Sequence, residues 1–307
     1  MNLRVWITIP LLICANCLLA PETCGQTPVD PRAAELRTKL GRELNQMAAQ
    51  FDGVMAIAFK DLTTNDLVAI NADTLMPQAS SIKTAILVEL LRQVQAGKLG
   101  LEERVEIRKA QFAGGSGVLQ TFGDGTSAVS LRDLAALMIV VSDNTATNIL
   151  IDRVGQMKVN TMLQSAGFER TRLMRKMIQP EEEKKGVENV STAREMAGIY
   201  EQLYRGKLLD EERTALALEL LKNEKSTEIR RGLPAGVALA SKPGSLAGVR
   251  CESGIVLLEG RPYVLSVMTT YAADEGAAER AITDVARRVY AYEERLAHSN
   301  AHGVKVQ

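Results

Sequence analysis

The stretch PQASSIKTAILVELL, residues 77–91, is a short polar segment that leads into an apolar helix. Ser80 and Lys83 are three positions apart, so on a helix both lie on one face and the lysine amine can reach the serine hydroxyl. Ser80 falls in the first turn, where free backbone N–H groups and the helix dipole favour developing negative charge. The stretch therefore offers a nucleophile beside a candidate base, although an N-cap serine followed by a solvated lysine has the same spacing.

The composition is that of a neutral protein with a large core. Of the 307 residues, 46% are hydrophobic, which suffices for one large domain or two interleaved ones. Lys plus Arg and Asp plus Glu both number 37, so no net charge attracts nucleic acid or an acidic surface. We therefore expect a small-molecule or uncharged polymeric substrate and no nucleic-acid partner. The sequence has no long heptad pattern, and we expect a monomer.

The first 25 residues have the pattern of a secretory signal. Arg4 supplies the positive charge, residues 6–20 are apolar, and residues 23–25 are small enough for cleavage. A membrane anchor is the alternative, but the apolar run is too short and contains Pro10 and Asn16. We expect export to the periplasm or the exterior, without stable insertion into the membrane.

Cysteine and histidine usage restricts the chemistry further. Three of the four cysteines fall within the predicted signal, which leaves Cys251 alone and excludes an internal disulfide in the mature chain. The two histidines, His298 and His302, lie in a polar C-terminal tail. A Ser-His-Asp triad, a Cys-His pair or a histidine-bound zinc ion is therefore not expected, nor is any cofactor. A nucleophilic serine here needs activation by a lysine or a carboxylate.

The hydrophobic pattern predicts an α+β fold. Two short runs joined by a turn indicate a hairpin, a long helical middle follows, and three more strands precede a final helix. A five-stranded antiparallel sheet that carries both terminal helices, with an inserted all-α domain, accounts for this order. The predicted sheet domain comprises residues 26–74 and 222–307, and the predicted all-α domain comprises residues 75–221.

Two further short motifs accompany Ser80 and Lys83. Ser142-Asp143-Asn144 follows a helix that is apolar on nearly every side, where the three polar residues form either an ordinary turn or part of a site. Lys242-Pro243-Gly244-Ser245 ends the first C-terminal strand, where a lysine is usually a solvated edge charge. Residues 114–117 are glycine-rich and are expected to form a plain surface loop.

Ser80-x-x-Lys83, Ser142-Asp143-Asn144 and Lys242-x-Gly244 occur in the order, and in the helix and strand contexts, of the three motifs of class A β-lactamases. The chain resembles that family over nearly all of its mature length. The resemblance implies that Ser80 attacks a β-lactam carbonyl to form an acyl-enzyme, with Lys83 as the base. Ser142 would pass a proton to the departing ring nitrogen.

The resemblance also implies how the substrate is held. Backbone N–H groups of Ser80 and Ser245, the latter next to Gly244, would form an oxyanion hole. Asn144 would bind the amide side chain of the substrate. Lys242 would attract the substrate carboxylate and help to keep Lys83 deprotonated.

Two features depart from the family pattern. Pro243 stands where the family has a threonine or serine, so one hydroxyl that binds the carboxylate is missing, and Arg250 is the expected replacement charge. The family also has a glutamate four residues before an asparagine, and together they hold the hydrolytic water. Here Lys185 occupies that position before Asn189, so we take Glu181 as the candidate base, with Glu182 and Glu183 as neighbouring alternatives.

The sequence thus predicts a serine β-lactamase of class A type. The alternative is a penicillin-binding hydrolase, such as a peptidoglycan D,D-peptidase or an esterase, that acylates readily and deacylates slowly. A third possibility is a binding protein that keeps the fold and recognises cell-wall peptides. The missing glutamate–asparagine pattern favours the second and third, whereas the intact serine and lysine motifs argue against the third.

Overall fold

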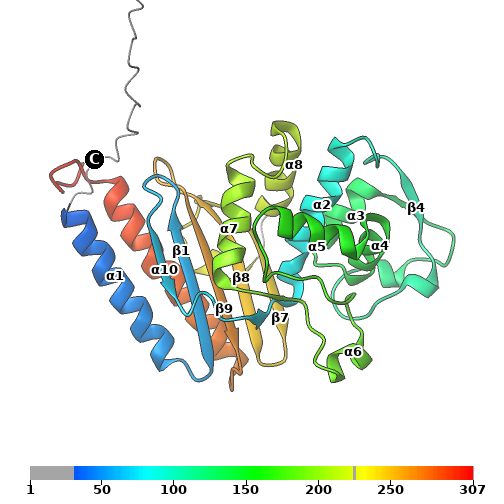
Figure 1. Ribbon diagram of the computed structural model, residues 1–307, viewed down its shortest axis with the longest axis horizontal. Coiled ribbons are helices and arrows are strands. Elements are labelled where there is room, and N and C mark those ends of the chain that lie inside the picture. Colours follow the sequence, from blue (N-terminus) through cyan, green and yellow to red (C-terminus); the bar gives the residue numbers. More distant parts are fainter. Residues whose placement is uncertain (1–30, 224–225, 307) are drawn as a thin grey trace, which may run out of the picture.

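The computed structural model describes residues 31–223 and 226–306 (Figure 1). The predicted signal lies outside these residues. The larger elements are, in chain order, α1 (Pro31–Gln50), β1 (Val54–Asp61), β2 (Leu67–Ile70), β3 (Met76–Pro77), α2 (Lys83–Gln95), β4 (Arg104–Glu106), β5 (Ala128–Ser130), α3 (Leu131–Val140), α4 (Asn144–Val154), α5 (Gln156–Ser165), α6 (Pro180–Lys184), β6 (Val190–Ser191), α7 (Ala193–Tyr204), α8 (Glu211–Lys222), α9 (Glu228–Arg231), β7 (Ala238–Leu246), β8 (Val249–Leu257), β9 (Tyr263–Thr270) and α10 (Glu275–Ala297). A 3₁₀ turn, η1 (Ala79–Ile82), leads directly into α2, and two more 3₁₀ turns, η2 (Lys109–Gln111) and η3 (Leu119–Thr121), lie between β4 and β5.

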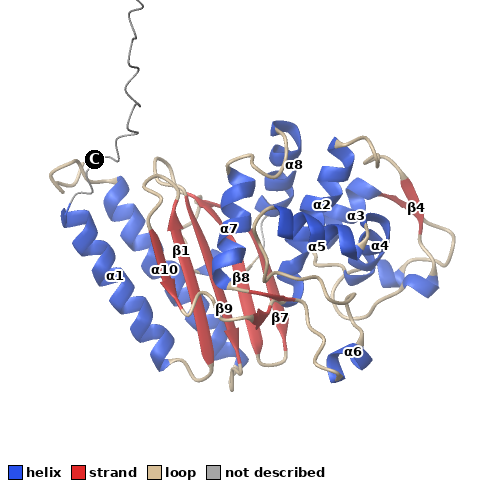
Figure 2. Cartoon of the chain, in the orientation of Figure 1, coloured by secondary structure: helices blue, strands red, loops and turns tan. Residues whose placement is uncertain are grey.

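Five antiparallel strands form the main sheet in the order β2-β1-β9-β8-β7 (Figure 2). β1 pairs with β9 along its whole length, from Val54 opposite Thr270 to Asp61 opposite Tyr263. The two ends of the chain therefore share one sheet, and the helical middle is inserted between them. This confirms the predicted five-stranded antiparallel sheet with both terminal helices.

Each face of the sheet has its own hydrophobic core. α1 and α10 cover one face (Figure 1), where Leu44, Phe59 and Val289 are fully buried. α7 packs on the opposite face, against β1, β8 and β9. α7 falls within the range 75–221 that the sequence assigns to the all-α domain, so the sheet and the helical region meet through this helix. The domain limits themselves stay a prediction.

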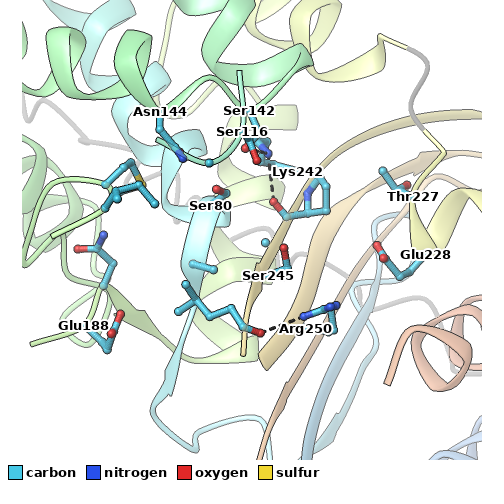
Figure 3. Close-up of a pocket in the computed structure, with 18 of the residues that line it drawn as sticks. Ser80, Ser116, Ser142, Asn144, Glu188, Thr227, Glu228, Lys242, Ser245 and Arg250 are labelled. Carbon is cyan, nitrogen blue, oxygen red and sulfur yellow. Dashed lines mark hydrogen bonds between the residues drawn. The ribbon is translucent and has the colours of Figure 1, made fainter. Parts of the chain in front are cut away.

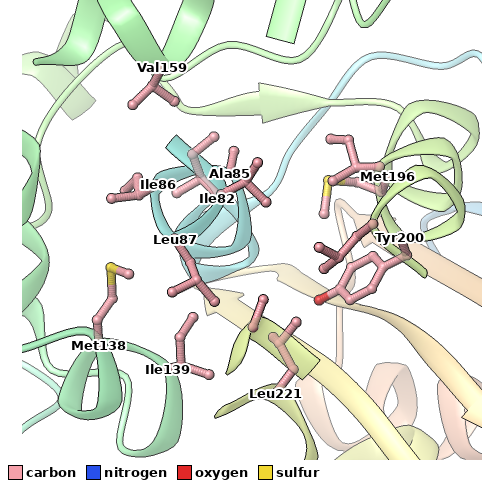
Figure 4. Close-up of a cluster of buried hydrophobic side chains, with 14 of the residues drawn as sticks. Ile82, Ala85, Ile86, Leu87, Met138, Ile139, Val159, Met196, Tyr200 and Leu221 are labelled. Atoms are coloured by element: carbon pink, nitrogen blue, oxygen red, sulfur yellow. The ribbon is translucent and has the colours of Figure 1, made fainter. Parts of the chain in front are cut away.

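α2 is the central helix of the helical region. Ten of its 13 residues are buried, because side chains from α3, α5, α7 and α8 surround it (Figure 4). Met138 and Ile139 of α3, Val159 of α5 and Leu221 of α8 belong to this cluster. A helix that is apolar on all sides needs such surroundings. The start of α2, where the site begins, is therefore rigidly placed.

β7 carries the lysine motif that the sequence places at the end of the first C-terminal strand. It runs from Ala238 to Leu246 and includes the whole Lys242–Ser245 motif. Pro243 lies opposite Glu252 of β8. Proline has no backbone N–H, so it cannot donate the hydrogen bond that would pair β7 with a strand on its other side. β7 is the last strand of the sheet, so the proline is tolerated there. In the part of the chain that the structure describes, no helix is long and apolar enough to cross a membrane.

Candidate active site

Ser80 lies in the 3₁₀ turn η1, immediately before α2. Ala79 adopts a positive φ of 46°, a conformation that costs free energy for a residue with a Cβ and that recurs at functional sites. The backbone of Gly244 in β7 lies directly against this turn. A Cβ on Gly244 would lie only 2.9 Å from the Ser80 nitrogen and 2.6 Å from the Gln78 oxygen. Only glycine permits this approach, which brings the backbone of β7 next to the serine.

Lys83, the first residue of α2, is fully buried. Its amine donates hydrogen bonds to the Ser142 carbonyl oxygen (2.8 Å), the Ser142 hydroxyl (3.0 Å) and Asn144 Oδ1 (2.9 Å). Burial lowers the pKa of Lys83 well below its usual value, and the nearby positive charge of Lys242 lowers it further, while Asp143 opposes the shift. A buried amine with a lowered pKa is suited to accept a proton.

The Ser142 hydroxyl lies between two lysine amines. Lys83 Nζ donates to it at 3.0 Å and Lys242 Nζ donates to it at 3.1 Å. Ser142 follows α3 and has a positive φ of 55°, which turns the chain so that Asp143 can cap α4. The carboxylate of Asp143 accepts from the backbone nitrogens of Ala146, Val118 and Leu119. Asp143 therefore fixes the position of Ser142 and Asn144 against the 114–119 loop.

Asn144 is held by the glycine-rich loop on the other side. Its Nδ2 donates to the Gly114 carbonyl at 2.9 Å, and a Cβ on Gly115 would lie 3.0 Å from the same nitrogen. Gly115 has a positive φ of 75°, which favours glycine, and a side chain at this position would contact Asn144. Residues 114–117, expected to be a plain surface loop, therefore contribute to the site through Gly115 and Ser116.

These groups open onto one cavity of about 420 Å³ between the sheet and the helical region. Ser80, Ser142 and Lys242 converge on it from η1, the α3–α4 turn and β7 (Figure 3). The remaining polar residues that line it are Ser116, Asn144, Arg175, Glu183, Glu188, Asn189, Ser226, Thr227, Glu228, Ser245, Arg250 and Glu279. A serine hydroxyl, two buried lysine amines and a second hydroxyl that joins the two amines form an arrangement suited to acyl transfer.

Comparisons with known proteins agree with this geometry. The model of the "Beta-lactamase enzyme family" matches residues 39–293. A beta-lactamase of Streptomyces fradiae is 30% identical over 242 residues, which cover 75% of this chain and 78% of the relative. The chain belongs to the class A β-lactamase family.

Solved structures of similar proteins include both β-lactamases and PBP-A. The beta-lactamase from Sphaerobacter thermophilus is 31% identical, with a TM-score of 0.77, and the match covers 84% of this chain and 97% of that one. The structure of PBP-A is 27% identical, with a TM-score of 0.78, over 84% of this chain and 96% of that one.

In this class A family member, the loop of residues 175–189 forms one wall of the cavity. Asn189 closes its base, where Oδ1 accepts from the nitrogens of Met174 (2.7 Å) and Arg175 (3.0 Å) and Nδ2 donates to the Arg175 carbonyl. Asn148 of α4 holds the backbone of Met177 at both its nitrogen (2.8 Å) and its oxygen (3.1 Å). Met177 and Ile178 line the cavity from this anchored segment.

Glu181, the candidate base, does not line the cavity. It lies in α6, its side chain is 78% exposed, and it pairs with Lys184 at 2.9 Å. Glu182 pairs in the same way with Lys185. The reason is that Asn189 bonds to the backbone at the base of the loop, and the segment that carries Glu181 forms the exposed helix α6.

The cavity-lining carboxylates of this loop are Glu183, one of the alternatives named above, and Glu188. Both pair with the buried Arg175 guanidinium, at 3.0 Å and 2.8 Å. Sequence reasoning did not single out Glu188. The available signal was Arg175, the one arginine within residues 175–189, together with the four glutamates of the same segment that could pair with it.

Arg250 lines the cavity, but its guanidinium already has several partners. It pairs with Glu275 and Glu279 of α10 and donates to the carbonyls of Leu246 and Val249. A substrate carboxylate that binds Arg250 would therefore compete with two glutamates. Lys242 is the better-placed cation, because its amine lies beside Ser142.

Proposed function

We propose that the protein is a serine hydrolase that opens β-lactams through an acyl-enzyme on Ser80, with β-lactamase activity in which deacylation is the slow step. The observation that supports this most directly is the Ser142 hydroxyl held between the amines of Lys83 and Lys242 beside Ser80. Export to the periplasm or the exterior is part of the proposal and rests on the sequence of residues 1–25.

In acylation, neutral Lys83 takes the proton of the Ser80 hydroxyl as its oxygen attacks the carbonyl carbon. The carbonyl oxygen becomes an oxyanion, which the backbone N–H groups of Ser80 and Ser245 would bind, since Gly244 lets β7 lie against η1. The carbon–nitrogen bond then breaks, and the ring nitrogen receives a proton from Ser142. Ser142 regains a proton from protonated Lys83 through the hydrogen bond that joins them.

Deacylation needs a base that activates water, and the loop offers a poor one. Glu183 and Glu188, the carboxylates that the 175–189 loop gives to the cavity, both pair with Arg175. Met177 and Ile178, which the loop also presents to the cavity, are apolar. We therefore expect the acyl-enzyme to form readily and to hydrolyse slowly.

The pairing of Glu183 and Glu188 with Arg175 also supports a second candidate function. A penicillin-binding D,D-peptidase or esterase also forms an acyl-enzyme on serine, and a β-lactam then remains attached because hydrolysis is slow. Its own substrate would be a cell-wall peptide or an ester with a carboxylate that Lys242 attracts. The absence of a free loop carboxylate among the described cavity residues favours this alternative over a fast β-lactamase.

Intact mass spectrometry of the mature protein with excess penicillin G tests both candidates. An adduct that forms and then disappears as the drug is consumed supports β-lactamase activity, and its decay rate measures deacylation. An adduct that outlasts removal of free drug supports the penicillin-binding hydrolase. Failure to form any adduct, while the protein is folded by circular dichroism, refutes both functions for penicillins.

A further inference from the structure

Glu252 is a fully buried carboxylate that the proposed chemistry does not use. It lies on β8 opposite Pro243 and is 0% exposed. One carboxylate oxygen accepts from the Ser241 hydroxyl at 2.6 Å, and the other accepts from the Ile229 backbone nitrogen at 2.7 Å. The Thr227 hydroxyl forms a further hydrogen bond with this carboxylate.

Ser241 and Ile229, the two residues that Glu252 connects, both lie next to residues that line the cavity. Ser241 directly precedes Lys242 in β7. Ile229 lies in α9, directly after Thr227 and Glu228, which line the cavity beside Lys242 (Figure 3). β7 is the edge strand, so no further strand of the sheet supports the 227–229 segment from that side. Glu252 therefore connects this segment to the strand that carries Lys242.

Such a carboxylate is costly for folding. Burial raises the pKa of Glu252 to about 7, even though hydrogen bonds from Ile229 and Ser241 act in the opposite direction. A buried apolar side chain at this position of β8 would usually stabilise the fold at least as well. The two main contacts of Glu252 both lead to the cavity wall, which indicates a role in shaping the site rather than in stability.

We propose that Glu252 is a positioning residue that fixes the 227–229 segment relative to Lys242 and thereby sets how tightly the site binds the substrate group that Lys242 attracts. The substrate class is a β-lactam or acyl peptide with a carboxylate next to the scissile bond. This inference rests on the proposed function of Ser80 and Lys242. Glu252 itself touches no reacting atom and acts through Ser241, Thr227 and Ile229.

The test compares three variants. Glu252→Ala removes both acceptors, and Glu252→Gln keeps the shape, with an oxygen for Ile229 and an amide that the Ser241 hydroxyl can accept from. Glu293→Ala is the matched control, because Glu293 is also fully buried, burial also raises its pKa to about 7, and it pairs with Arg261 instead of the cavity wall. Penicillin G acylation is followed at several drug concentrations, which separates the apparent dissociation constant from the maximal acylation rate.

We expect Glu252→Ala to raise the dissociation constant about tenfold, with little change in the maximal acylation rate, since the hydrogen bonds from Ser241, Ile229 and Thr227 are lost outside the reacting centre. Glu252→Gln should restore most of the affinity. Glu293→Ala should lower the melting temperature and leave the dissociation constant unchanged. Equal effects of both alanine variants, or an unchanged dissociation constant in Glu252→Ala, would overturn the proposal.

Hydrogen exchange of the peptide that spans residues 226–232 gives a readout independent of acylation. Faster exchange at Ile229 in Glu252→Ala, but not in Glu293→Ala, supports the positioning role, and unchanged exchange overturns it. If the wild-type protein forms no penicillin adduct, the proposed function fails, and the exchange result alone decides whether Glu252 holds this wall.

Discussion

The turn that carries Ser80 and the loop of residues 175–189 face the same cavity, but they differ in how their polar groups are used. Around Ser80, the amines of Lys83 and Lys242 meet at the Ser142 hydroxyl and leave the serine itself open to the cavity. In the loop, Arg175 pairs with Glu183 and Glu188, and Asn189 bonds to the backbone at the base of the loop. The polar groups of the first region converge on the nucleophile turn, whereas those of the loop bond mainly to one another and to the loop backbone. The difference supports the proposal that acylation is fast and deacylation is slow.

Replacing Lys83 gives the largest expected effect and tests the first region. Lys83→Met keeps a long side chain in the buried site but removes the proposed base and its hydrogen bonds to Ser142 and Asn144. We expect acylation by penicillin G to slow by about 10³-fold, the range for loss of a general base. The measurement is the rate of adduct formation by intact mass. Lys176→Met, at a lysine paired with Asp152 outside the nucleophile turn, is the control. Equal rates in Lys83→Met and the wild type would remove Lys83 from the mechanism.

Placing a carboxylate on the 175–189 loop tests whether this loop limits deacylation. Met177 lines the cavity from a backbone that Asn148 holds at both its nitrogen and its oxygen, so Met177→Glu directs a carboxylate into the cavity, where Arg175 already pairs with Glu183 and Glu188. We expect the penicillin adduct to decay about 10²-fold faster, since a positioned base then activates water.

Met177→Gln has the same side-chain length and no base, and should leave adduct decay unchanged. The decay is measured by intact mass after free drug is removed. A long-lived adduct in both variants would mean that the loop does not limit deacylation.

The order of secondary structure and the position of the serine and lysine motifs were accessible from the sequence, because both depend on local spacing. Ser80 and Lys83 are three residues apart on one helical segment, and the five strands each have a hydrophobic run of their own. Which loop residues face the cavity depends instead on contacts distant in sequence. Asn148 fixes Met177 from 29 residues away, and the charge-rich tip with Glu181 turns to solvent.

The close approach of one backbone segment to another could not be predicted from the sequence either. The need for glycine at Gly115 arises only once Asn144 packs against it, and a glycine-rich stretch by itself is typical of any surface loop. The partners of Arg250 lie on α10, 25 and 29 residues further along the chain. The sequence can therefore identify Arg250 as a candidate cation, but it does not show that Glu275 and Glu279 already pair with it.

The pH dependence of acylation gives a smaller effect within the first region. The pKa of Lys83 is lowered first by burial and then by the charge of Lys242. In the proposed mechanism neutral Lys83 is the base, so acylation should be lost as the pH falls through this lowered pKa. Removing Lys242 raises the pKa of Lys83, so Lys242→Ala should move the acidic limb of the profile to higher pH. The maximal acylation rate is measured from pH 5 to 9. A limb that does not move, or moves to lower pH, would contradict the assigned coupling.

Ile178 provides the smallest expected effect, on the choice of substrate. It has a positive φ of 53°, a strained conformation for a β-branched residue, and it lines both the main cavity and a neighbouring cavity of about 310 Å³. A Cβ on Gly115 would lie 3.5 Å from Ile178 Cδ1, so the two loops meet here and separate the cavities. Ile178→Gly relieves the strain and removes the side chain between them.

We expect Ile178→Gly to acylate β-lactams with bulky acyl side chains up to about tenfold faster relative to penicillin G, the discrimination that a few methylene groups provide. The measurement is the ratio of second-order acylation rates for the two kinds of drug. Ile178→Asn, which tolerates a positive φ and keeps a side chain at this position, should relieve strain without widening the cavity and should leave the ratio near that of the wild type. If both variants change the ratio equally, strain rather than the side chain governs selectivity, and the 175–189 loop shapes the substrate site through its backbone.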